Sequence, residues 1–125
     1  MRALLSQGLS ALGLDTSRTE TLERFSSLLL EKNQVMNLTA ITEPDAVAQL
    51  HLLDSAAVLQ FVDLTGKNVV DVGTGAGFPG MPLRILKDDF DLTLLDSLSK
   101  RVNWLHDVCN ELQLKRVQCV HARAE

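Results

Sequence analysis

The chain has few cysteines, no excess of positive charge and no long apolar run, and each scarcity argues against a class of protein. Its 125 residues include two cysteines, Cys109 and Cys119. Their spacing fits neither a metal site nor a small disulfide-stapled domain, so we expect reduced structural thiols. The formal net charge of −4 provides no overall basic surface for nucleic acid, although it does not exclude a local basic patch. No segment is apolar for long enough to form a signal peptide or cross a bilayer, which favours a cytoplasmic protein.

What the chain does contain is typical of one globular domain with two regions. Hydrophobic residues make up 46% of the sequence and charged residues 22%, and the length suits a single domain. Residues 1–62 carry apolar side chains at helical spacing, which predicts a helical region. Its expected helices cover residues 4–12, residues 17 to between 33 and 37, and residues 44–61, the last either continuous or restarting near Asp54. Ser17 and Glu20 have the spacing of a capping box at the start of the second helix.

Residues 63–125 alternate between strand and helix patterns. The predicted strands cover residues 68–72, 91–95 with Asp96 at the end, and 116–121; the predicted helices cover 79–86 and 99–112. This order is typical of an α/β protein with a parallel, doubly wound sheet. Three strands make only half of such a sheet, and an open edge is an aggregation hazard. We therefore expect the front part of a longer protein, the alternative being a three-stranded mini-domain that pairs with a partner chain.

The most informative segment is residues 68–80, where an apolar run leads into glycine at every second position. Glycine allows positive φ and lets a ligand approach the backbone closely. Gly75-x-Gly77-x-x-Gly80 matches the dinucleotide fingerprint, in which a pyrophosphate lies at a helix N-terminus. However, Gly73 and Thr74 intervene after the strand, and Asp71 would repel a pyrophosphate. A carboxylate beside a glycine-lined slot instead favours S-adenosylmethionine (SAM), which carries an ammonium group and a sulfonium.

Further candidates flank this loop. Asp96 closes the second strand about 20 residues beyond the turn, where an acid binds ribose hydroxyls in NAD and SAM enzymes alike. Asp71 and Asp96 have a structural alternative, which is to cap the turn and the following helix. Phe78 could cover the ligand or belong to the core. Ala124 and Glu125 follow the third strand, at the sheet end that flanks an adenine ring.

Other polar residues have two interpretations each. His51 and Asp54 share one helix face at spacing i, i+3 and could pair at the mouth of the cofactor site, or His51 could be a buried or capping histidine. Lys100 and Arg101 could contact RNA phosphates or be solvated surface charges.

Together these segments resemble the glucose-inhibited division protein B family, whose bacterial members methylate N7 of a guanosine in 16S ribosomal RNA with SAM. The resemblance covers nearly the whole chain and is carried by four segments: Asn37-Leu38-Thr39, His51-x-x-Asp54-Ser55, the glycine loop 71–80, and Leu94-Leu95-Asp96-Ser97-x-x-Lys100-Arg101.

The resemblance implies a class I (Rossmann-like) SAM methyltransferase fold with an incomplete parallel sheet, the chain holding mainly the cofactor-binding half. It implies SAM contacts at Gly73, Phe78, Ala124 and Glu125, with Asp71, Gly75 and Asp96 shaping the pocket. It also implies the small ribosomal subunit as partner. Because N7 of neutral guanine carries no proton, no catalytic acid or base is expected, and no metal.

The alternatives are a non-catalytic fragment or interaction module and an NAD-dependent oxidoreductase fragment. We expect a monomer when the protein is complete, with association through the open sheet edge where it is not.

Overall fold

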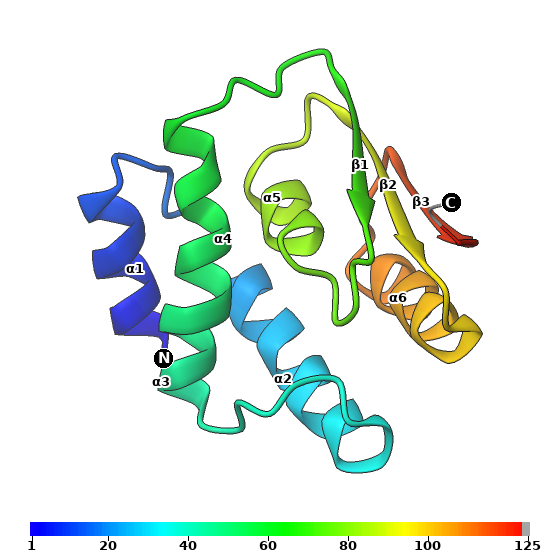
Figure 1. The fold of residues 1–125 in the computed structure, drawn as a ribbon. Coiled ribbons are helices and arrows are strands. Elements are labelled where there is room, and N and C mark those ends of the chain that lie inside the picture. The colour runs from blue at the N-terminus through cyan, green and yellow to red at the C-terminus, as the bar shows by residue number, and fades with distance from the viewer. Residues whose placement is uncertain (124–125) are drawn as a thin grey trace.

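The computed structural model describes residues 1–123, and its elements fall into a helical region followed by a region of alternating strands and helices (Figure 1). Helix α1 (Arg2–Ala11) buries Leu5 and Leu9. Helix α2 (Thr19–Met36) is followed by the capping residue Asn37, which has a left-handed φ of 53°. Asparagine is one of the few residues that accept this conformation at a helix end. Both helices therefore begin and end close to the positions that the sequence predicts.

The predicted capping box at Ser17 is wrong. The residue before α2 is Arg18, and it makes no side-chain cap bond. Ser17 Oγ instead donates to Asp15 Oδ2 at 2.6 Å, and the Ser17 amide donates to Asp15 Oδ1 at 2.9 Å. These two hydrogen bonds hold Ser17 in a turn beside Asp15, and such local side-chain bonds compete with helix capping.

A third helical run is continuous from residue 44 to residue 60. It consists of α3 (Pro44–Val47), a π-helical turn η1 (Ala48–Leu53), α4 (Asp54–Ala56) and a 3-10 turn η2 (Ala57–Gln60). Pro44 opens the run, where its missing N–H costs no hydrogen bond. The π-helical turn carries His51, and such turns occur often at functional sites.

The sheet has three parallel strands in the order β1-β2-β3. They are β1 (Asn68–Val72), β2 (Asp91–Asp96) and β3 (Val117–His121), linked by α5 (Gly80–Leu86) and α6 (Ser99–Glu111). Val70 lies beside Thr93, and Leu94 beside Cys119. The α/β fold with an incomplete parallel sheet is therefore confirmed.

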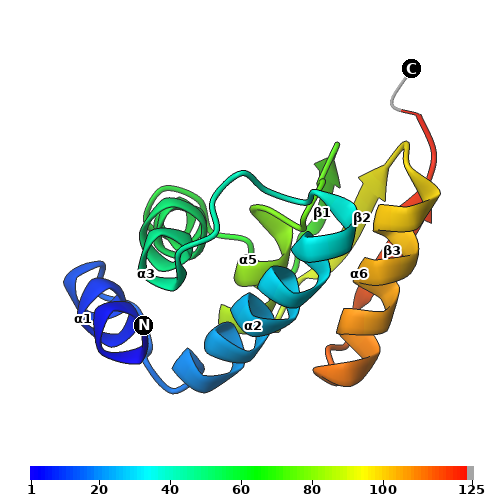
Figure 2. The ribbon, with the colours of Figure 1, turned by 90° about the horizontal axis from the view of Figure 1, so that it is seen from below.

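In the part of the chain described, helices cover one face of this sheet, which fits the first half of a doubly wound arrangement. Helices α5 and α6 pack on the face that carries Leu94 and Cys119 (Figures 1 and 2). On the other face Val70 and Val72 are 55% and 57% exposed. Because the strands follow one another in a single direction and crossovers are right-handed, both crossover helices lie on the same side.

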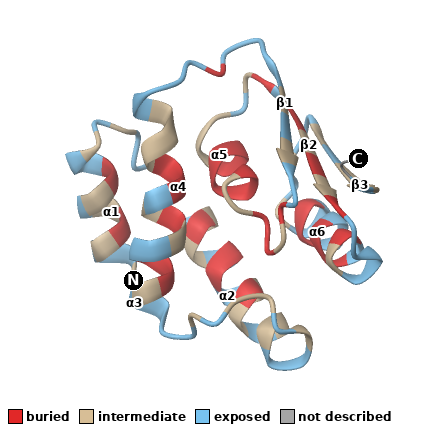
Figure 3. Cartoon of the chain, viewed as in Figure 1, coloured by how far each residue is buried: buried red, intermediate tan, exposed pale blue. Residues whose placement is uncertain are grey.

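One core joins the two regions. The buried side of α1 packs against α2 and the third helical run, and α2 and the third helical run in turn contact α5 (Figure 3). The core includes Phe25 of α2, Leu52 of the π-helical turn, Met81 of α5 and Leu105 of α6, all fully buried. Among residues 1–123, no helix is both long and apolar enough to cross a membrane.

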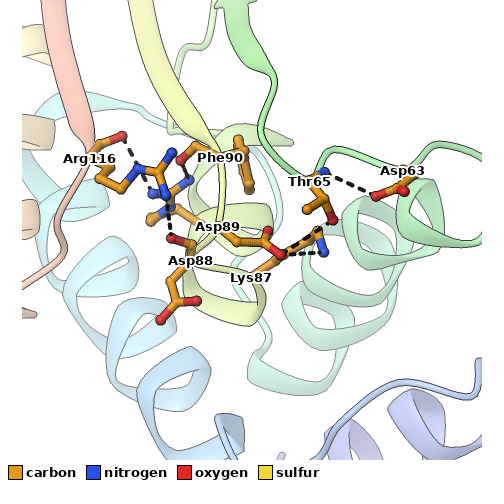
Figure 4. Close-up of polar contacts among 8 residues, drawn as sticks. Asp63, Thr65, Lys87, Asp88, Asp89, Phe90 and Arg116 are labelled. Atoms are coloured by element: carbon orange, nitrogen blue, oxygen red, sulfur yellow. Dashed lines mark hydrogen bonds and ion pairs between the residues drawn. The ribbon is translucent and has the colours of Figure 1, made fainter.

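The amino ends of the strands are fastened by polar contacts. Thr65 and Lys87 both reach the Asp89 carboxylate, and Arg116 contacts the Asp88 carbonyl oxygen (Figure 4). On α5, Arg84 is 2% exposed. It donates to the carbonyl oxygens of Phe90 and Lys115 and lies 4.1 Å from the Phe90 ring centroid. These contacts all lie at the amino ends of the strands, whereas the glycine loop lies at their carboxyl ends.

Candidate functional site

The candidate site lies at the carboxyl ends of β1 and β2. The glycine loop, residues 73–79, follows β1, and Asp96 ends β2. The loop is joined to β2 because the amides of Gly73 and Thr74 donate to the Leu95 carbonyl oxygen at 2.8 and 3.1 Å. In open α/β sheets this end is where ligands bind.

Two of the loop glycines face open space. Gly73 and Gly75 have φ of +67° and +60°, a region that side chains rarely allow, yet a Cβ on either would meet no atom within 4 Å. They are therefore needed for the backbone course of the loop and not for packing. The space in front of them is available to a ligand.

Gly80, by contrast, is needed for close packing. A Cβ there would lie 2.4 Å from Leu94 Cδ2 and 2.8 Å from Asp71 Oδ2. Gly80 is not among the site residues predicted from the sequence, although the last glycine of the fingerprint is the one that allows helix and strand to approach. Its role is to bring the start of α5 onto the sheet.

The Asp71 carboxylate holds both ends of the glycine loop through hydrogen bonds. Its Oδ2 accepts hydrogen bonds from Thr74 Oγ1 at 2.6 Å and from the Gly80 amide at 2.9 Å. Burial raises the pKa of Asp71, and the hydrogen bonds from Thr74 and Gly80 oppose this shift. The structural role considered for Asp71 is thus present, and its influence on a ligand acts through the shape of the loop.

Asp96 links the loop to the start of α6. It is 3% exposed, its Oδ2 accepts from the Gly75 amide at 2.8 Å, and its Oδ1 accepts from the Leu98 amide at 2.9 Å. Arg101 Nη1 lies 3.7 Å from the same Oδ2. Arg101 is therefore directed at a carboxylate of the site, while Lys100 is exposed. A direct contact between Asp96 and a ribose stays a prediction.

Phe78 connects the loop to the helical region. Its ring stacks on His51, with centroids 4.4 Å apart and an interplanar angle of 10°, and meets the Phe25 ring edge-on at 5.7 Å. Thr39 Oγ1 lies 2.8 Å from His51 Nε2. Burial lowers the pKa of His51, and the nearby charge of Asp54 opposes this shift. Neither this stack nor the part played by Thr39 was predicted from the sequence, in which Thr39 belongs only to a segment that carries the family resemblance.

A cavity of about 300 Å³ opens between the third helical run and the end of the glycine loop. Its lining residues are Leu50, His51, Asp54, Ser55, Val58, Phe78 and Pro79. His51 and Asp54 thus share one cavity, as their spacing predicts, but no ion pair joins them in the described residues.

The chain after β3 leads toward Asp96. The Ala122 amide donates to the Asp96 carbonyl oxygen at 3.1 Å, and His121 Nε2 lies 3.0 Å from the Ser97 carbonyl oxygen. Ala124 and Glu125 lie outside the described residues, so their contacts stay predictions. Over residues 1–123, no group of three or more His, Cys, Asp or Glu side chains could hold a metal ion.

Comparison with known proteins points to one family. The profile of the GidB family, described as rRNA small subunit methyltransferase G, matches residues 18–125. A protein of Lachnoclostridium phytofermentans named ribosomal RNA small subunit methyltransferase G is 48% identical over 95% of this chain and 50% of its own length. Proteins of the same name from Desulforamulus reducens and Clostridium botulinum are 44% and 48% identical, over 97% and 81% of this chain and 52% and 43% of their own lengths. The chain spans about half the length of the curated relatives it matches.

Proposed function

Because this chain belongs to the rRNA small subunit methyltransferase G family, we propose that it forms the SAM-binding part of an enzyme that methylates N7 of a guanosine in 16S rRNA. One observation supports this most strongly. The glycine loop presents open space beside two backbone positions without side chains, and a buried carboxylate holds the loop in place.

The residues present suit SAM. An ammonium and a sulfonium favour carboxylates nearby, and Asp71 and Asp96 lie under and beside the loop. A Cβ on Gly73 or Gly75 would project into the open space that the ligand would fill. The half-buried Phe78 ring can close the slot on one side. The proposed SAM-binding set is Gly73, Phe78, Ala124 and Glu125 in contact with the cofactor, with Asp71, Gly75 and Asp96 shaping the pocket.

The chemistry places few demands on the protein. When bound, SAM would supply an electrophilic methyl group, and N7 of neutral guanine offers a lone pair without a proton. No general base is therefore required, and we assign no catalytic acid or base. The task of the side chains is to orient the base toward the loop and exclude water, and such positioning lowers a barrier by several kcal/mol. The target base has to leave its stack to reach the site.

The same proposal includes the partner and the setting of the complete protein. The substrate is 16S rRNA within the small ribosomal subunit, the complete protein is a monomer, and it works in the cytoplasm. Lys100, exposed at the start of α6, suits contact with RNA phosphates, which position a nucleic acid without reading its sequence.

Calorimetric titration tests the cofactor assignment. We expect saturable binding of SAM and S-adenosylhomocysteine, and none of NADH. Asp96→Ala and Gly75→Leu should each weaken SAM binding at least about tenfold, since the first releases the Gly75 amide and the second fills the open space. Asp107→Asn, an exposed substitution on α6, is the matched control. Unchanged affinity in both site variants contradicts the site, and preferential binding of NADH contradicts the cofactor.

A further inference from the structure

The cavity beside the glycine loop has two unlike walls. The third helical run supplies one wall, and Phe78 and Pro79 supply the other. Its volume of about 300 Å³ is at the small end of the range for ligand sites, which suits a single planar ring system. Because Phe78 and Pro79 continue directly from Gly77, whatever occupies this cavity lies next to the candidate SAM site.

The cavity carries one negative charge and one neutral ring. Asp54 is exposed, and within residues 1–123 its carboxylate has no hydrogen bond or ion pair. Burial lowers the pKa of His51 below its ordinary 6.5, so its ring is neutral at pH 7. An ionised carboxylate only accepts hydrogen bonds, through two oxygens. A ligand with two adjacent donors on one edge therefore fits best.

We propose that this cavity receives the target guanine and that Asp54 accepts hydrogen bonds from its N1–H and its exocyclic N2 amino group. This inference rests on the proposed function. Guanine has two donors side by side on that edge, whereas adenine has an acceptor at N1 and no amino group at C2. Paired bonds to a carboxylate are strong and directional, so Asp54 selects guanine over adenine.

The same arrangement leaves the reactive atom free. N7 is an acceptor on the far side of the guanine ring system from N1 and N2. A base held by Asp54 on the helical wall therefore directs N7 away from that wall, toward Phe78 and the glycine loop. The apolar side chain of Val58 and the ring of Pro79 offer surfaces for its faces.

Charge also favours this assignment. Methylation of N7 transfers positive charge to the guanine ring, and a nearby carboxylate stabilises charge as it develops. The neutral His51 does not oppose it. His51 acts as a positioning residue, since its stack on Phe78 and its contact with Thr39 fix the wall that faces the base.

Nuclear magnetic resonance titration of the 125-residue chain tests the inference with 5′-monophosphates of guanosine, inosine and adenosine. Inosine keeps N1–H and lacks the N2 amino group, so it separates the two hydrogen bonds. We expect GMP to shift the His51 and Phe78 resonances, IMP to bind more weakly, and AMP to bind about tenfold more weakly than GMP. Asp54→Asn should remove the preference for GMP, and Asp107→Asn should retain it.

Equal binding of GMP and AMP overturns the inference, as does a GMP preference that survives Asp54→Asn or the absence of any shift at His51 and Phe78. A parallel titration with SAM keeps the two proposals apart. If the unsubstituted chain does not bind SAM, the proposed function is contradicted. If it binds SAM but shows no preference for guanine, only the role of Asp54 is contradicted.

Discussion

The fold needs the Asp71 side-chain oxygen as a hydrogen-bond acceptor, whereas burial disfavours the negative charge of that side chain. Asp71→Ala leaves the Gly80 amide and the Thr74 hydroxyl without their acceptor, and we expect it to lower the free energy of unfolding by about 1–3 kcal/mol. Asp71→Asn keeps an acceptor oxygen without the charge, so its loss should be smaller. Urea denaturation at pH 7, with Asp107→Asn as control, measures both. Equal losses in the two variants would show that the charge matters more than the hydrogen bonds.

The pH dependence of Asp71 has a definite sign. Burial raises its pKa in the folded protein, so the folded chain binds the proton more readily than the unfolded chain, where the pKa is about 3.9. Its contribution to stability therefore falls as pH rises from the unfolded pKa through the raised folded pKa, and is constant above that window. We expect the stability of the unsubstituted chain relative to Asp71→Asn to fall in the same way. Denaturation of both chains at a series of pH values from 3 upward measures this, and parallel curves would contradict it.

Individual residues were predictable from the sequence where the chemistry is local. The glycine loop is visible because alternate glycines after an apolar run have few other uses, and capping by Asp71 and Asp96 follows from their places beside turns. The stack of His51 on Phe78 could not be predicted. It depends on how the third helical run packs against the loop, and periodicity shows which side of a helix is buried but not what it meets.

At the scale of elements, Arg84 of α5 fastens two neighbouring segments. Its buried guanidinium donates to the carbonyl oxygens of Phe90 and Lys115. Arg84→Met should lower the free energy of unfolding by about 2–4 kcal/mol, because buried carbonyl groups lose their partner. Arg84→Lys should also destabilise, since an ammonium cannot reproduce the planar fork.

Arg24→Met is the matched control for this measurement. Arg24 forms an exposed ion pair with Glu111 at 3.2 Å, and such pairs contribute only about 0–1 kcal/mol. Chemical denaturation of the three variants compares them directly. If Arg84→Met cost no more than Arg24→Met, the guanidinium would not be what fastens α5 to the sheet.

Element boundaries were predictable to different degrees. The strand over residues 68–72 matches β1 at both ends, because an apolar run bounded by polar residues and glycine has one interpretation. The π-helical turn at Ala48–Leu53 was not predictable, since the spacing of apolar residues hardly differs between one π-helical turn and an α-helix. The capping box failed because Asp15 offered Ser17 a nearer partner.

At the scale of the whole molecule, the sequence predicts the order of strands and helices but not how the sheet is covered. Alternating strands and helices indicate a parallel sheet. Whether helices lie on one face or both depends on whether successive strands add in one direction or reverse. Here they add in one direction, so valines that look like core residues of a two-sided sheet lie on the uncovered face.

That uncovered face predicts association of the 125-residue chain with a second copy of itself. Val70 and Val72 are exposed next to half-buried Leu95 and Val120, and contiguous apolar surface on a sheet favours contact between molecules. We expect sedimentation velocity to show a larger species that grows with concentration, and Val70→Lys combined with Val72→Lys to suppress it. Val35→Lys is the control, because Val35 is 78% exposed but lies on α2, away from the sheet. A folded chain that stays monomeric at every concentration contradicts the prediction. Suppression by Val35→Lys alone would place the contact on the helical region instead.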